Sequence, residues 1–316
     1  MTKLSIVVHT EEEFDWDGGF YRSNNKVTHG KELTEFCEKL IQVGGKIVFA
    51  MDYAFVSSEE GKDVITFFQH HYPNDVEFAS HLHPWVNPPF EDCDPVPEKH
   101  SYPGNLPYSL EFEKLKCLTE LIEKTVGKRP TTYLAGRYGV GANSYAILSK
   151  LGYTHDVSIS AFADFTHQDG PDFSDHTNHI VTKEDITCLP HSTGYVSWLS
   201  SFSNYLNKAP NNLNKLNSNI IGKVCLRLLG VEKVRLSAEG FNFMQMQKLA
   251  KSLLATGSQH LIFSFHSASV KKGCTPYSKS ANEHSRFLSD SIEFIKLVNN
   301  SSNDDMGLLN SLIQKR

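Results

Sequence analysis

Several features that are common in proteins are missing from this sequence, and each absence narrows its class. The six cysteines occur without any Cys-x-x-Cys pair, which favours free thiols in a reducing compartment over a disulfide framework or a zinc knuckle. No apolar run approaches the length that crosses a bilayer, and the apolar stretch after Met1 is too short for a secretory signal. We therefore expect a cytoplasmic protein without a membrane span.

A block of charge of one sign is also lacking. Lys and Arg total 31 against 36 Asp and Glu, which gives a formal net charge of −5, and no basic stripe is evident. This balance argues against nucleic acid and against an anionic membrane as partners. No repeat or clear linker divides the 316 residues, of which 40% are hydrophobic. We expect one domain over residues 1–300, followed by a polar tail over 301–316.

What the chain does contain is an alternation of strand-like and helix-like segments. Apolar, β-branched runs predict buried strands, and shorter candidates join them; the strands are expected at 3–8, 46–50, 76–80, 131–135, 156–159, 186–190, 233–236 and 260–265. Amphipathic spacing predicts helices at 30–43, 59–72, 110–126, 143–151, 211–229, 241–255 and 282–298. Long inserted loops are expected at about 84–108 and 160–230. The pattern predicts an α/β fold with parallel strands and about seven strand–helix units in a barrel-like arrangement.

Ionisable side chains follow most of the predicted strands. They are His9 and Glu11, Asp52, His81 and His83, Arg137, Asp156, and His266. Because the chemistry of such folds lies at the carboxyl ends of the strands, we expect these groups to gather there.

His81 and His83 end one predicted strand and are separated by one residue. If residues 76–80 are extended, both rings point to the same side and could bind one ion; the alternative is an ordinary polar strand end. Two histidines and a carboxylate suit zinc or a similar divalent ion, with positions left for water and substrate. A further carboxylate or histidine could accept a proton from that water and another histidine could donate one, which predicts metal-assisted hydrolysis.

Four motifs in order resemble the polysaccharide deacetylase family, which is the NodB-homology or carbohydrate esterase 4-like group, and especially its divergent WalW-like branch. They are Thr-Glu-Glu-Glu-Phe-Asp-Trp at 10–16, His-Leu-His-Pro-Trp-Val-Asn-Pro-Pro at 81–89, Ala-Gly-Arg-Tyr-Gly at 135–139, and Phe-His-Ser-Ala-Ser at 265–269 with Thr-Pro-Tyr at 275–277. The resemblance implies a distorted (β/α)7 barrel of the NodB-homology type. It also implies a hydrolase that removes an N-acetyl group from an amino sugar or glycan precursor, acting on a linear amide C–N bond other than a peptide bond.

The resemblance implies a metal site at Glu11, His81 and His83, with zinc expected and cobalt or nickel as alternatives. The family usually places its second histidine four residues after the first, where this chain has Trp85, so His83 takes that place. His9 stands where the family has an acidic proton acceptor, and a neutral imidazole can accept a proton. In another register, that role passes to Glu12, Glu13 or Asp15.

The remaining motifs resemble the groups that handle the leaving amine and the sugar. His266 resembles the proton donor, and Asp156 the acid that orients it, although Asp156 could be a simple cap. Arg137 matches an arginine that holds the catalytic acid, with pairing to a surface acid as the alternative. Trp85 and Tyr138 would shape the pocket for a carbohydrate that carries an N-acetyl group.

Two other functions stay open at this level. His9 in place of an acid, together with the missing His-x-x-x-His spacing, also fits a catalytically inactive deacetylase-like barrel that binds carbohydrate or a protein partner. Related barrels hydrolyse other amides, such as cyclic imides or formamides. Acetate release from N-acetylated sugars with added zinc, cobalt or nickel distinguishes an active deacetylase from the inactive barrel. Activity on a panel of non-sugar amides tests for hydrolysis of another amide.

Overall fold

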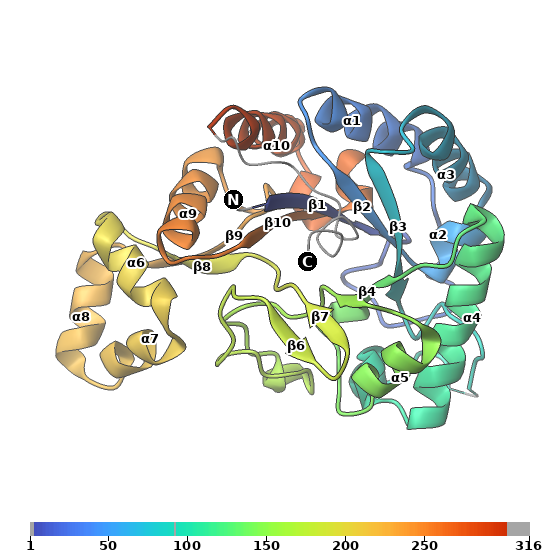
Figure 1. The fold of residues 1–316 in the computed structure, drawn as a ribbon, viewed down its shortest axis with the longest axis horizontal. Coiled ribbons are helices and arrows are strands. Elements are labelled where there is room, and N and C mark those ends of the chain that lie inside the picture. The colour runs from blue at the N-terminus through green and yellow to red at the C-terminus, as the bar shows by residue number, and fades with distance from the viewer. Residues whose placement is uncertain (1–2, 92, 302–316) are drawn as a thin grey trace.

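A strongly curled sheet of eight strands forms the centre of the molecule, in a computed structural model that describes residues 3–91 and 93–301 (Figure 1). The strand order is β10-β1-β2-β3-β4-β5-β7-β6. In chain order the strands are β1 (Lys3–Thr10), β2 (Ile47–Met51), β3 (Val76–Leu82), β4 (Thr132–Ala135), β5 (His155–Asp156), β6 (Val181–Lys183), β7 (Ile186–Cys188) and β10 (His260–His266). Seven of them are parallel to their neighbours, and β6 is antiparallel to β7. The predicted distorted (β/α)7 barrel is confirmed.

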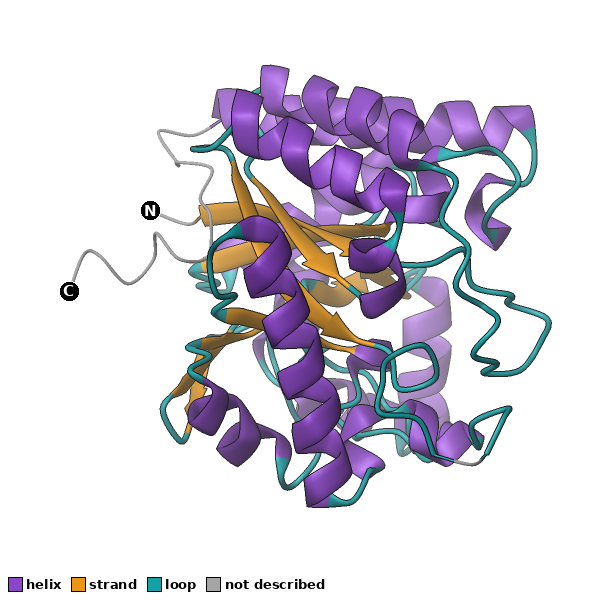
Figure 2. Ribbon diagram, turned by 90° about the vertical axis from the view of Figure 1, so that its right-hand side faces the viewer, coloured by secondary structure: helices purple, strands orange, loops and turns teal. Residues whose placement is uncertain are grey.

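Helices pack around the outside of this sheet (Figure 2). They are α1 (Gly30–Gln42), α2 (Tyr53–Ser57), α3 (Glu59–His71), α4 (Tyr108–Val126), α5 (Ser144–Leu151), α9 (Phe243–Ala255) and α10 (Ala281–Ser301). Strands covered in this way are buried on both faces, which explains why β1 reads as a continuous apolar run: Ile6, Val7 and Val8 are all fully buried. No helix in the described ranges is both long enough and apolar enough to cross a membrane.

Backbone hydrogen bonds close the ring between the two sides of the curled sheet. The N–H of His191, after β7, donates to the Ile159 carbonyl at 2.7 Å, and the Leu236 N–H donates to the Ser192 carbonyl at 2.9 Å. On the other side, the Ser264 N–H of β10 donates to the Leu236 carbonyl at 2.9 Å. The segments around residues 191 and 236 therefore complete the wall of the barrel.

Residues 193–235 leave the barrel as a two-stranded sheet with three helices between its strands. The elements are β8 (Thr193–Val196), α6 (Ser200–Lys208), α7 (Pro210–Asn217), α8 (Ile220–Leu228) and β9 (Glu232–Arg235). The strand predicted at 233–236 thus pairs antiparallel with β8, outside the main sheet. The helix predicted over 211–229 is two helices, because the Asn219 side chain caps a new one by accepting a hydrogen bond from the Gly222 N–H.

Short 3-10 turns lie in the connections: η1 (Glu98–Ser101), η2 (Pro103–Asn105), η3 (Gly136–Tyr138), η4 (Thr166–Gln168), η5 (Ser267–Val270) and η6 (Pro276–Ser278). The loop that follows β3 is fixed by the buried Lys114 of α4. Its Nζ donates to the carbonyl oxygens of Pro84, Asn87 and Pro89 at 2.9, 2.6 and 2.7 Å. Of the predicted tail at 301–316, all but the first residue lies outside the described residues.

Candidate metal centre and active-site cavity

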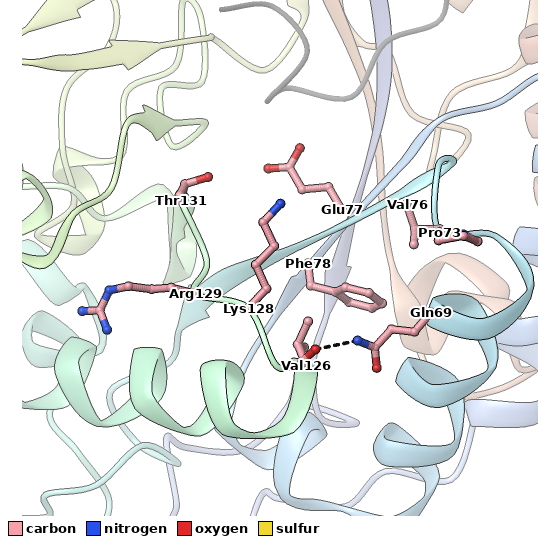
Figure 3. Close-up of a pocket in the computed structure, with 9 residues that line it drawn as sticks. All are labelled: Gln69, Pro73, Val76, Glu77, Phe78, Val126, Lys128, Arg129 and Thr131. Carbon is pink, nitrogen blue, oxygen red and sulfur yellow. Dashed lines mark hydrogen bonds between the residues drawn. The ribbon is translucent and has the colours of Figure 1, made fainter. Parts of the chain in front are cut away.

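The carboxyl ends of the barrel strands surround a cavity of about 560 Å³. Most of the side chains that line it are aromatic or ionisable: His9, Glu11, Phe14, Trp16, Phe20, His81, His83, Trp85, Glu98, Tyr102, Arg137, Tyr138, Phe165, Gln168, Arg235, His266 and Tyr277. A smaller cavity of about 290 Å³ lies at the opposite ends of β3 and β4, next to α3 and α4 (Figure 3). None of its lining residues is a histidine, so the larger cavity is the candidate functional site.

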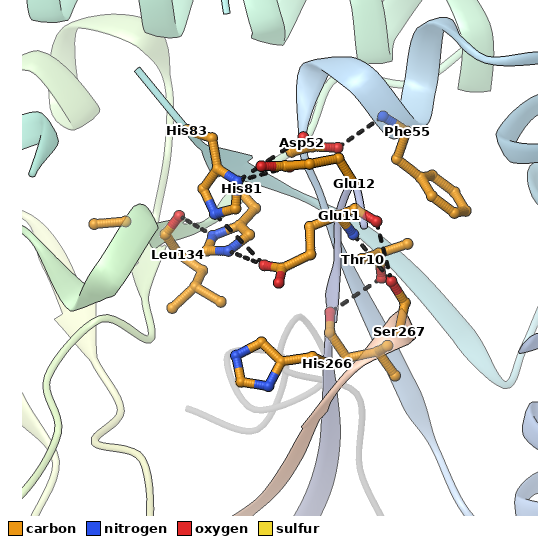
Figure 4. A network of polar contacts seen from close by, with 12 residues as sticks. Thr10, Glu11, Glu12, Asp52, Phe55, His81, His83, Leu134, His266 and Ser267 are labelled. Carbon is orange, nitrogen blue, oxygen red and sulfur yellow. Dashed lines mark hydrogen bonds and ion pairs between the residues drawn. The ribbon is translucent and has the colours of Figure 1, made fainter. Parts of the chain in front are cut away.

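Glu11, His81 and His83 meet in this cavity (Figure 4). One carboxylate oxygen, Oε2 of Glu11, lies 3.2 Å from Nε2 of His81 and 3.5 Å from Nε2 of His83. The two rings are 4.4 Å apart between centroids, because alternate side chains of an extended segment share a face. The sequence analysis predicted these three residues as metal ligands, and the structure brings them together.

The outer nitrogen of each ring is already engaged. Nδ1 of His81 lies 3.0 Å from the Leu134 carbonyl oxygen, and Nδ1 of His83 lies 2.9 Å from Oε2 of Glu12. Both acceptors require a proton on Nδ1, so the lone pair of each ring is on the Nε2 that faces Glu11. Metal-binding histidines are held in this way by a carbonyl or a carboxylate behind them, so the donor set fits a divalent ion such as zinc.

The electrostatics of the three ligands agree with that fit. Burial disfavours the Glu11 carboxylate, but the positive charge of the nearby His266 is the largest effect that opposes it, and the pKa of Glu11 is lowered to about 2. Burial lowers the pKa of both His81 and His83. At neutral pH the group therefore offers an ionised carboxylate and neutral imidazoles, which are the forms that bind metal.

Glu12 lies behind His83 and does not line the cavity. Its two oxygens accept hydrogen bonds from Nδ1 of His83 and, at 2.8 Å, from Nε1 of Trp85. Because Glu12 does not reach the cavity, its position does not fit the predicted role of proton acceptor. Its hydrogen bond instead holds the His83 ring in place. Burial and the Glu11 charge raise the pKa of Glu12 to about 7, and burial beside Glu12 raises the pKa of Asp52 well above its usual range. The two carboxyls are therefore not both ionised.

His266 faces the ligands from the last strand, and its partner is Glu239. Nδ1 of His266 lies 2.8 Å from Oε2 of Glu239, whose Oε1 accepts the His266 backbone N–H at 3.0 Å. Burial disfavours the charged ring, but the Glu239 and Glu11 carboxylates outweigh it and raise the pKa of His266 to about 9. His266 is therefore a cation at neutral pH and can donate a proton.

Asp156, predicted to orient His266, does not do so. It lies at the end of β5 and accepts hydrogen bonds from the Ser158 N–H at 3.1 Å and from the Tyr145 hydroxyl at 3.4 Å. Glu239 takes the predicted role. Its sequence signal was an acidic residue three positions after the strand predicted at 233–236. It was missed because that strand pairs outside the main sheet, and no sequence feature shows that the chain after it returns to lie beside β10.

His9 stands at the centre of the site, in register with His266 on the neighbouring strand. Its ring centroid lies 4.8 Å from that of His266, 5.3 Å from that of His81 and 5.4 Å from that of His191. Burial and the surrounding positive charge hold the pKa of His9 well below its usual range. A neutral ring next to the metal-ligand group can accept a proton, which is the role predicted for it.

Arg137 lines the cavity, but its hydrogen bonds go to neither His9 nor the acidic residues that follow it. Its guanidinium donates to the Ser101 hydroxyl at 2.6 Å and to Oε1 of Gln168 at 2.8 Å, and it pairs with Glu98 at 3.2 Å. It also lies 4.1 Å from the centroid of Tyr102. The predicted contact with a catalytic acid is therefore replaced by contacts that hold the rim of the cavity.

The two predicted pocket residues, Trp85 and Tyr138, both line the cavity. Trp85 stacks on His83 with ring centroids 4.3 Å apart. The Tyr138 hydroxyl accepts a hydrogen bond from Arg235 at 2.8 Å. Arg235 and His191 also reach this region, and the sequence analysis did not single them out as site residues, because both come from the bridging segments that close the ring.

Comparisons with known proteins identify relatives by structure alone. No protein-family model matches the sequence, and no curated protein does. A 4-alpha-glucanotransferase from Thermococcus litoralis shares the fold at a TM-score of 0.53, with 10% identity over 100% of this chain and 40% of that one. A candidate polysaccharide deacetylase from Mycobacterium smegmatis gives 0.49, with 11% identity over 99% and 90% of the two chains. A peptidoglycan deacetylase from Bacillus subtilis gives 0.43, with 8% identity over 98% and 89%.

Proposed function

We propose that this protein is a divalent-metal-dependent hydrolase that removes an N-acetyl group from an amino sugar or glycan precursor. One observation carries the proposal: the Nε2 atoms of His81 and His83 converge on a single oxygen of Glu11, at 3.2 and 3.5 Å, inside an aromatic cavity. The motifs that resemble polysaccharide deacetylases supply the choice of amide and sugar. Zinc is the expected ion, with cobalt or nickel as alternatives.

Each residue of the site has a distinct task in this proposal. An ion held by Glu11, His81 and His83 would polarise the amide carbonyl and lower the pKa of water. His9, neutral and buried, accepts the proton of the attacking water. His266, kept protonated by Glu239, gives its proton to the departing amine. The acid and the base thus come from two histidines that differ in protonation because their surroundings differ.

The lining of the cavity supports a sugar as the substrate. Trp16, which is 40% exposed, and the half-buried Tyr277 offer apolar ring surface, against which the C–H faces of a pyranose ring can pack, while the buried Trp85 and Tyr138 form the wall behind. Ionisable and polar side chains line the same cavity beside the aromatic ones, and such groups can orient a sugar through its hydroxyl and amide groups. A free volume of about 560 Å³ accommodates one or two sugar units.

Metal content and acetate release, measured on the same preparations, test the proposal. Wild-type protein loaded with zinc should retain about one ion per chain. His81→Ala and His83→Ala should lose the ion, whereas His70→Ala, which changes an exposed histidine of α3, should keep it. His266→Ala should keep the ion and lose most acetate release from N-acetylated sugars.

Two results would overturn parts of this assignment. Full occupancy after both His81 and His83 are replaced would place the metal elsewhere. A wild type that binds the ion but releases no acetate from sugars, with zinc, cobalt or nickel, would favour a barrel that binds carbohydrate without cleaving it.

A further inference from the structure

Helix α8 turns an apolar face away from the protein. Its buried residues are Gly222 and Leu226, and at about 100° per residue the opposite side carries four aliphatic residues. These are Ile220, Ile221, Val224 and Leu228, which are 80%, 78%, 50% and 76% exposed. Trp198, whose side chain is 81% exposed, lies at the end of the helix, where its backbone N–H donates to the Leu229 carbonyl at 3.1 Å. We call these five residues the α8 face.

The residues of the α8 face do not contribute to the hydrophobic core of this region. Tyr195, Leu206 and Leu226 of residues 193–235 form a small core together with Ala161 and Phe162 from the segment after β5. Asn207 of α6 holds β8 by bonds to the backbone of Tyr195, and its Nδ2 donates to the Ser252 hydroxyl of α9, which ties the region to the barrel. An ordinary surface helix buries its apolar side and exposes its polar side, and α8 also exposes apolar residues. Contiguous apolar surface of this kind marks an interaction site.

The charge around the α8 face is positive, although the chain as a whole has a net charge of −5. Residues 186–231 contain no Asp or Glu, and they contain Lys208, Lys215, Lys223 and Arg227. Lys223 and Arg227 lie along one border of the α8 face, between it and the buried side of the helix. The net charge of the whole chain does not reveal this positive segment, because the Asp and Glu residues that outnumber Lys and Arg lie elsewhere in the chain.

We infer that the α8 face binds the surface of an anionic lipid membrane. Its aliphatic residues and Trp198 enter the boundary between headgroups and acyl chains, while Lys223 and Arg227 contact lipid phosphates. The helix lies on the bilayer, since nine residues are far too few to cross it. This inference departs from the expectation, drawn from total charge, that no anionic membrane is a partner. It does not rest on the proposed hydrolase activity.

Charge favours lipid over a second copy of the chain. A two-fold symmetric contact through the α8 face would bring Lys223 and Arg227 of the two copies together, and like charges across an interface disfavour association. A layer of anionic headgroups complements the same cations. Each cation near such a surface strengthens binding roughly fivefold.

Co-sedimentation with vesicles tests the inference. Wild-type protein should pellet with vesicles of phosphatidylcholine and phosphatidylglycerol, and at least tenfold less with phosphatidylcholine alone. The triple variant Ile220→Ser/Ile221→Ser/Leu228→Ser and the charge variant Lys223→Glu/Arg227→Glu should each lose at least tenfold in binding. Matched controls on α9, Leu254→Ser and Lys248→Glu/Lys251→Glu, also change exposed residues and should bind like the wild type.

A salt titration of the unaltered protein gives a test that does not depend on any variant. Raised salt should release it from anionic vesicles, because the cations are screened. Equal binding to both kinds of vesicle, no binding to either, or loss of binding in the α9 controls would each overturn the inference. So would dimerisation in sedimentation velocity that the triple variant abolishes, since the face would then be an interface between copies.

Discussion

At the scale of single residues, Glu239 decides the protonation of His266. Both oxygens of its carboxylate serve this histidine, one at the ring and one at the backbone N–H. Without a counter-charge, burial would favour the neutral ring, as it does for the neighbouring His9. Two histidines whose centroids are 4.8 Å apart therefore hold different protonation states, and in the proposed mechanism this difference separates the proton donor from the proton acceptor.

Glu239→Gln should make His266 a weaker base. The protonated ring is the donor, so activity that needs it falls as pH rises through the pKa, which is about 9 in the wild type. Loss of the carboxylate should lower that pKa by roughly 1–3 units and move the alkaline limb toward neutral pH by the same amount. The Glu11 carboxylate also raises the pKa of His266, but an ion bound at Glu11 would offset its charge. Glu239 would then be the carboxylate that sets this pKa.

The pH dependence of kcat measures this shift. Glu232→Gln, at an exposed position of the neighbouring strand, serves as the control and should leave the profile unchanged. A Glu239→Gln enzyme with the wild-type alkaline limb would show that His266 is not the group that titrates.

The partner of His266 could not be predicted from the sequence alone. Asp156 begins the strand predicted at 156–159 and Glu239 follows the one predicted at 233–236, and nothing in the sequence tells which of the two acids reaches His266. The choice depends on the segment after β9 lying beside β10, through the hydrogen bond between Leu236 and Ser264. The pairing of His81 with His83, by contrast, was predictable from strand alternation, and the choice of Glu11 as their partner came from the resemblance to polysaccharide deacetylases.

At the scale of elements, the loop after β3 depends on α4 for its shape. Three of its carbonyl oxygens accept hydrogen bonds from the buried ammonium of Lys114, and Nδ2 of Asn87 donates back to the Lys114 carbonyl at 2.8 Å. Burial lowers the pKa of Lys114 to about 8, so the side chain is still mostly charged at neutral pH. The loop begins next to His83, so its position bears on the metal ligands.

Lys114→Met should destabilise the protein by on the order of 3 kcal/mol, because the carbonyl oxygens lose a charged donor in a buried place. Urea denaturation measures the change. Lys116→Met, in the same helix, removes a lysine whose side chain is 43% exposed and should change the free energy of unfolding by less than about 0.5 kcal/mol. Equal effects of the two substitutions would mean that the three hydrogen bonds contribute no net stability.

Regular elements were predicted well where the periodicity was strong. The helices at 30–43, 59–72 and 110–126 agree with α1, α3 and α4 to within about two residues, which is the usual uncertainty of helix ends. Prediction weakened between residues 156 and 236, where strands are two to four residues long and polar residues interrupt the apolar pattern. A short strand at a barrel seam is stabilised by the strands beside it, and its own few residues carry no sequence pattern that predicts those neighbours.

At the scale of the whole molecule, a bound ion would link parts of the barrel that are distant in sequence. Anything that binds the folded state alone raises its stability, by about 2.7 kcal/mol at a hundredfold excess over Kd. Zinc should therefore raise the Tm of the wild type, and excess chelator should reverse the change.

Thermal melting with and without zinc checks this coupling. The rise in Tm should disappear in His81→Ala and persist in the exposed-site control His70→Ala. An equal rise in a variant that lacks both His81 and His83 would show that zinc stabilises the protein from another site.

The pairing of β1 with β10 has a further consequence, for the order of biosynthesis. His266 is translated long after His9, yet they are register partners on adjacent strands. Until β10 docks, β1 has a free edge that invites wrong partners, and contacts of such long separation form slowly. The ribosome must therefore release β10 before the cavity at the strand ends can form, and until then the unpaired edge of β1 is open to chaperones and proteases.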